Sequence, residues 1–90
     1  MEETSIVRLE AWRLLHAEEG LPYLRQALPL TDWEGGLDLL ADALSEWDKS
    51  LGLVLIGADL LRESSWGKRL LGVLTQAAHE NPALHLVFRD

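Results

Sequence analysis

The chain has 90 residues, of which 48% are hydrophobic, and a formal net charge of −7 at pH 7. This length predicts a single domain, residues 1–90, that buries somewhat more than about 60% of its unfolded surface. The acidic balance argues against a nucleic acid or an anionic membrane as ligand, because both need a basic surface. It favours a basic partner instead.

The sequence contains no cysteine, which excludes disulfides and thiolate metal sites and fits a reducing compartment. Residues 1–5 are acidic where a signal peptide would be basic, and no apolar run approaches the roughly 20 residues that span a bilayer. We therefore expect a cytoplasmic protein that does not enter a membrane.

The first half of the chain predicts one strand and one helix. Residues 5–10 form a short β-type run, and the spacing of the leucines over residues 17–28 predicts a helix. Because proline fits comfortably only in a first helical turn, Pro22 predicts that this helix starts late.

Residues 32–47 predict an amphipathic helix entered through a turn at Gly35-Gly36 and ending near residue 47 or 48. At about 100° per residue, Asp38, Asp42 and Glu46 form a narrow acidic stripe, and only Leu39 strays towards it. The opposite side is apolar and consists of Leu37, Leu40, Ala41, Leu44 and Trp47. Residues 32–48 contain six acidic residues and no basic one, so this segment carries −6 of the chain's −7.

The second half predicts two more strands. Residues 51–57 are apolar without alternation, which is typical of a central strand covered on both faces. Asp59 is a candidate N-cap of a short helix through Glu63, and Ser64 or Ser65 is a candidate cap of a longer helix that Asn81-Pro82 ends. A β-type run over residues 83–88 follows, so strands separated by helices predict a parallel α/β layer.

The tryptophans have different predicted roles. Trp47 ends the apolar stripe, so we expect it in the core, and Trp12 and Trp66 are expected to be partly buried supports. Trp33 lies in a turn between two acidic residues, where burial is hard to arrange. We therefore expect Trp33 to stack on a partner.

Several segments together resemble the barstar family, the intracellular inhibitors of the microbial ribonuclease barnase. The resemblance extends over nearly the whole chain in order and spacing. Its most specific part is Leu28-Pro29, an aromatic and glycine turn, Leu37-Asp38-x-x-x-Asp42-Ala43-Leu44, and Trp47. The strand at residues 53–55, the last helix through Val73 and Ala77, and the run from Leu84 to Phe88 are also similar.

The resemblance implies an α/β fold with a three-stranded parallel sheet packed by about four helices. It also implies a protein inhibitor of a basic microbial ribonuclease, without enzymatic activity or cofactors, that is monomeric when free. In such inhibitors, carboxylates of the second helix replace RNA phosphates in the nuclease active site. Asp38 and Asp42 match the family's two aspartates of this kind.

Other positions match family contacts less closely. Trp33, or alternatively Asp32, stands at the position of a turn aromatic, and Gly36 stands where an asparagine is usual. Ala41 replaces a contacting tryptophan, and Gln76 replaces a carboxylate of the last helix. With Glu46 from the acidic stripe, these residues complete the expected partner surface. The turn is about two residues longer than usual, which leaves the target nuclease open.

Other interpretations of the same residues remain. The acidic stripe could be an ordinary solvated face, or the target could be a different toxin nuclease. Asp38 and Asp42 could instead hold a divalent cation or act as an acid and base pair in an enzyme, although two carboxylates without further oxygen ligands make a poor site for either. A structural module that pairs through an exposed sheet edge would form a concentration-dependent dimer. The histidines at 16, 79 and 85 are scattered and predict no metal site.

Overall fold

The computed structural model describes residues 5–30, 33 and 36–89. In chain order, the elements are β1 (Ser5–Glu10), the 3₁₀ helix η1 (Ala11–Arg13), α1 (Ala17–Ala27), α2 (Leu37–Ser45), β2 (Leu51–Ile56), the 3₁₀ helix η2 (Ala58–Glu63), α3 (Ser65–Glu80) and β3 (Leu84–Arg89). The predicted α/β class is confirmed. None of the helices in the described part of the chain is long and apolar enough to cross a bilayer.

The three strands form one parallel sheet in the order β1-β2-β3, so the prediction of a central strand at residues 51–57 is confirmed. Val7, Leu53 and Leu86 are register partners across the sheet. Between β2 and β3, the hydrogen-bond ladder runs from Leu51 N, which donates to Ala83 O (3.0 Å), to Gly57 N, which donates to Arg89 O (2.7 Å).

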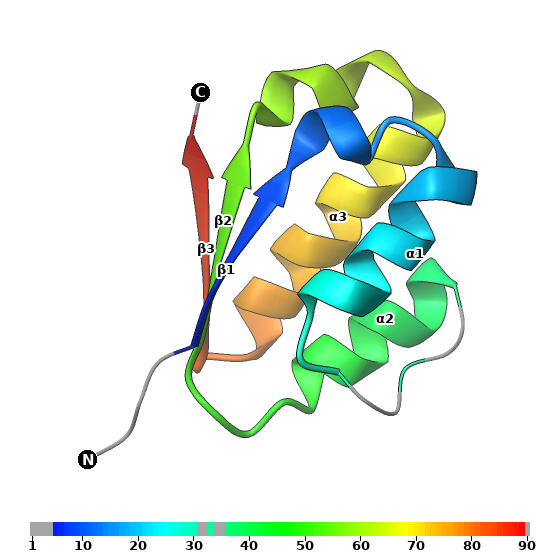
Figure 1. Cartoon of the computed structure of the whole chain (residues 1–90). Coiled ribbons are helices and arrows are strands. Elements are labelled where there is room, and N and C mark those ends of the chain that lie inside the picture. The colour runs from blue at the N-terminus through cyan, green and yellow to red at the C-terminus, as the bar shows by residue number, and fades with distance from the viewer. Residues whose placement is uncertain (1–4, 31–32, 34–35, 90) are drawn as a thin grey trace.

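The molecule has two layers, with the helices packed on a single face of the sheet (Figure 1). The expectation that β2 is covered on both faces is therefore wrong. Its burial alternates: Leu51, Leu53 and Leu55 are fully buried, whereas the residues between them are only half-buried. An apolar residue on the open face of a central strand is shielded by its two neighbouring strands, so an unbroken apolar run does not require a second layer.

The starts of α1 and η2 differ from the prediction. α1 begins at Ala17 with Pro22 inside it, so the expected late start is wrong. The His16 carbonyl accepts from Gly20 N (2.7 Å) and starts the helix, and the exposed Pro22 is accommodated in its second turn. Gly57, in the left-handed region at φ 78°, precedes η2 where Asp59 was the expected cap. Ser64 caps α3 as predicted, because its side chain accepts from Gly67 N.

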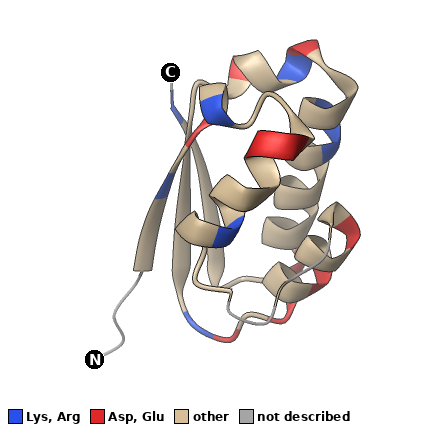
Figure 2. Ribbon diagram, turned by 45° about the vertical axis from the view of Figure 1, so that its right-hand side comes forward, with Lys and Arg blue, Asp and Glu red and all other residues tan. Residues whose placement is uncertain are grey.

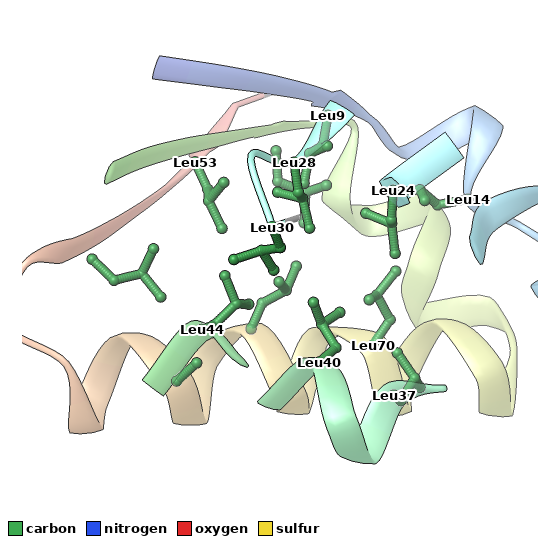
Figure 3. Close-up of a cluster of buried hydrophobic side chains, with 14 of the residues drawn as sticks. Leu9, Leu14, Leu24, Leu28, Leu30, Leu37, Leu40, Leu44, Leu53 and Leu70 are labelled. Carbon is green, nitrogen blue, oxygen red and sulfur yellow. The ribbon is translucent and has the colours of Figure 1, made fainter. Parts of the chain in front are cut away.

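The apolar side of α2 faces the sheet, as its periodicity predicts. Leu37, Leu40 and Leu44 are buried and point into the same cluster as Leu30 and Leu53 (Figure 3). α2 ends at Ser45, slightly before the predicted end, and the chain then runs to β2. The helix is therefore fixed by one leucine-lined side, and its opposite side is left to solvent.

The C-terminal end of α2 is tied to the end of α3 by a buried asparagine. The Asn81 Nδ2 group donates to Leu44 O (2.8 Å) and to Trp47 O (2.7 Å), while its Oδ1 accepts from Ala83 N (3.0 Å). Asn81 thus satisfies two carbonyls at the end of α2, a helix terminus where backbone carbonyls lack helical partners. It joins α2, α3 and the start of β3.

We predict that Asn81→Ala lowers the free energy of unfolding by about 1–3 kcal/mol, because buried carbonyl groups lose their donors. Asn81→Asp keeps the acceptor but not the donors, so we expect a similar loss at neutral pH. Urea unfolding followed by circular dichroism measures both. The control is Arg69→Ala on the exposed side of α3, expected to stay within about 0.5 kcal/mol. Equal stabilities for Asn81→Ala and the control would contradict this role.

Candidate protein-binding surface

Four carboxylates form the candidate site, which we name the acidic surface: Asp38, Asp42, Glu46 and Glu80. All four side chains are exposed. The first three recur every four residues along α2 and its C-cap, so they lie above one another on one side of the helix. Figure 2 shows this side of α2 as a red band at the edge of the molecule, away from the sheet.

The acidic surface is rigidly placed but not neutralised. Asp38 and Asp42 project from a helix whose other side is buried through Leu40 and Leu44. Among the residues that the structure describes, the ion pair formed is Arg62 with Asp59 in η2 (3.4 Å), and none involves the acidic surface. The carboxylates are thus available to a cation from outside the chain.

Glu80 belongs to the acidic surface although the sequence did not predict it. Gln76 Nε2 donates to Glu80 Oε1 (2.8 Å), and Ser45 Oγ donates to Glu80 Oε2 (3.0 Å). These hydrogen bonds, first from Gln76 and then from Ser45, lower the pKa of the Glu80 carboxyl below its ordinary value of 4.5. They also aim the carboxylate across the junction between α3 and α2.

Gln76 lies beside Glu80 on α3. It is exposed on α3, as a partner contact would be, but its amide is used to orient Glu80. The spacing of four residues between the two could have suggested the pair. The bond from Ser45 could not be predicted, because it depends on how α2 packs on α3.

Trp33 is buried, with only 5% of its surface exposed, so the expectation that burial would be hard to arrange is wrong. Its indole Nε1 donates to Gly36 O (3.1 Å), which satisfies the polar atom, and the Arg25 guanidinium lies 5.7 Å from the ring centroid. In this conformation the ring packs with the core and is not presented for stacking on a partner. The alternative contact, Asp32, lies outside the described residues.

The remaining candidate contacts lie at the start of α2 or within it. Gly36 is exposed and is the N-cap of α2, at a backbone φ of −89° that other residues also adopt. Ala41 is half-buried and lies between the leucine side and the acidic side. Leu39 follows Asp38 in the chain and is 55% exposed, so an apolar side chain lies next to the acidic surface.

Of the other three tryptophans, two pack against the core and one is exposed. Trp47 is half-buried against the core, and half-buried Trp66 donates from Nε1 to Leu14 O (2.8 Å), so both predictions are confirmed. Trp12 is 58% exposed, so the prediction that it is partly buried is wrong. It lines a shallow hollow with Arg13, Glu19 and Tyr23, in which the Arg13 guanidinium stacks on the Tyr23 ring at 4.2 Å.

Comparison with known proteins gives no match to a protein-family model and none to a curated protein. No group of three or more histidine or acidic side chains in the described ranges is arranged to hold a metal ion. The chemistry that the acidic surface offers is recognition of cationic groups by carboxylates fixed on a helix.

We predict that the pKa of Glu80 in a carbon-detected NMR titration lies below 4.5, because two donors favour its charged form. Any stability that this shift contributes is present at pH values above the pKa of Glu80 in the unfolded chain. It is lost as the pH falls through the pKa of Glu80 in the folded protein. Gln76→Ala and Ser45→Ala should each raise the pKa of Glu80, Gln76→Ala more. Thr75→Ala, an exposed change on α3, should not. A pKa of Glu80 that none of these variants changes would show that the two hydrogen bonds do not form.

Proposed function

We propose that the protein is an inhibitor of a basic microbial ribonuclease, and that the acidic surface is the part that enters the nuclease active site. An immunity protein against a different toxin nuclease is the alternative target within the same mechanism. The observation that carries the proposal is the set of exposed, unpaired carboxylates on α2, with a further carboxylate from α3 aimed towards them. The resemblance of the α2 segment to the barstar family supports the same proposal.

The mechanism is electrostatic mimicry of a polyanion. A ribonuclease active site binds phosphates through lysine and arginine, and carboxylates are alternative acceptors for the same groups. Asp38 and Asp42 are four residues apart, so their Cβ atoms lie about 5–6 Å from each other on one helix side. A partner cation can therefore contact both. Occupying these cationic groups excludes RNA without any reaction.

The fold holds α2 in place before the partner arrives. Asp38 lies in the first turn of α2, where the helix dipole stabilises a negative charge by about 0.3–1 kcal/mol, and this offsets repulsion from Asp42. Little conformational freedom is lost on binding, because α2 is already held by its leucine side and by Asn81. The opposed charges of the two proteins would accelerate encounter and make binding sensitive to salt.

Burial of Trp33 changes which residues would complete the contact. With that ring in the core, the exposed apolar residue next to the acidic surface is Leu39. Glu80 supplies the α3 carboxylate that Gln76 does not. The proposed partner site is therefore a cationic cleft with a small apolar spot beside it.

We predict that Asp42→Ala weakens the complex with the target nuclease by about 2–5 kcal/mol, the range for removing one member of a buried charge pair, to which the barnase–barstar complex itself contributed. Titration calorimetry against small basic microbial ribonucleases, alongside inhibition of RNA cleavage, measures the loss. The matched control is Glu63→Ala, which removes an exposed carboxylate of η2. Its effect should be below 1 kcal/mol.

The same titration can contradict the proposal. A loss below about 1 kcal/mol for Asp42→Ala would mean that this carboxylate is not at the contact. The fold stability of Asp42→Ala should be nearly unchanged, because a solvated side chain touches no core residue. Weakened binding therefore cannot be attributed to unfolding if thermal unfolding matches that of the wild type.

A further inference from the structure

The two edges of the sheet differ in whether their outward backbone groups have hydrogen-bond partners. Along the outer edge of β1, the Tyr23 hydroxyl accepts from Glu10 N (3.0 Å) and donates to Arg8 O (3.4 Å). These backbone groups would otherwise be available to another strand. Tyr23, from α1, thus satisfies the outward backbone groups at the C-terminal end of β1.

The outer edge of β3 is open. Ala83 O and Arg89 O accept from β2, and ladder bonds of a parallel pair recur at every second residue. The N–H and C=O groups of Leu86 and Phe88 therefore point away from β2. No hydrogen bond from the described part of the chain covers them. A row of free backbone groups of this kind is a template for another strand.

The side chains of β3 are also suited to pairing. Val87 is 44% exposed on the open face of the sheet, and Phe88 is 50% exposed on the face that carries the helices. β3 has no carboxylate, and its ionisable residues are His85 and Arg89. In a chain of net charge −7, this segment is where two copies can approach with little repulsion.

We propose that β3 pairs antiparallel with β3 of a second copy, so that the two sheets join into one. In a twofold register centred on Val87, Leu86 of one copy lies opposite Phe88 of the other, and every outward N–H and C=O group of these two residues is paired. Val87 then meets its own counterpart on the open face. The strand is self-complementary in this register, as a twofold interface requires.

The proposed contact between the two β3 strands is small, so we expect a weak association. A strand of this length extends about 20 Å and buries well under the roughly 800 Å² per partner of a stable interface. The dimer should therefore form only at high concentration, and the free protein should be monomeric when dilute. β3 lies on the opposite side of the molecule from α2, so the pairing leaves the carboxylates of α2 uncovered (Figure 1). The pairing is independent of the proposed inhibition.

Sedimentation equilibrium tests the pairing between roughly 10 µM and 1 mM, concentrations that bracket a weak association. We expect a reversible monomer–dimer equilibrium in the wild type. Phe88→Pro removes an outward N–H without touching the β2 ladder, so it should abolish the dimer. Val87→Lys should weaken it at least tenfold by placing like charges at the twofold axis.

Ile6→Lys is the matched control, because Ile6 is 69% exposed on the same open face but lies on β1. It should leave the dimer unchanged. Loss of the dimer in Ile6→Lys would instead show packing through the open face and would overturn the proposal. So would a monomer at every concentration, association beyond dimers, or a dimer that persists in Phe88→Pro.

A covalent test does not depend on the strength of association. Residues facing each other at a non-hydrogen-bonded antiparallel position have Cα atoms about 4.5 Å apart, within the range that a disulfide spans. Because the chain has no cysteine, Val87→Cys introduces a unique thiol. Under a mild oxidant, Val87→Cys should form a disulfide-linked dimer at least tenfold faster than Ile6→Cys. Equal rates would overturn the register.

Discussion

The placement of α2 depends on the side chain of Asn81. This buried amide donates to carbonyls at the end of α2 and accepts from the residue before β3, so one side chain links the acidic helix to α3 and to the sheet. The leucines of α2 determine which side faces inward, but apolar packing is not directional. The hydrogen bonds of Asn81 are directional, and they hold the C-terminal end of α2 against the end of α3.

The fold separates the residues that stabilise it from those that we propose to bind a partner. Leu37, Leu40 and Leu44 supply the burial, and the acidic side of the same helix contributes no core contact. The like charges of Asp38 and Asp42 cost only a few tenths of a kcal/mol in a helix. The chain can therefore carry an unneutralised negative surface at little cost in stability.

The sequence predicted the elements that depend on local pattern. All three strands, their parallel order and the leucine side of α2 follow from apolar spacing and from the alternation of strands and helices. Most errors concern packing, which the local pattern does not determine. Which faces of β2 are covered depends on where the helices pack. The burial of Trp33 depends on the core side chains that surround its ring, and its hydrogen bond to Gly36 O is local. Glu80 was missed because the hydroxyl that orients it lies on another helix.

The central claim is that Asp38 and Asp42 bind a basic ribonuclease. The most direct measurement is a pull-down at low salt from the lysate and culture medium of the source organism, comparing the wild type with the Asp38→Ala/Asp42→Ala variant. We expect the wild type alone to retain a small basic protein that cleaves RNA and is inhibited on rebinding. Recovery of the same nuclease by both proteins, or of no nuclease by either, would contradict the role of the acidic surface.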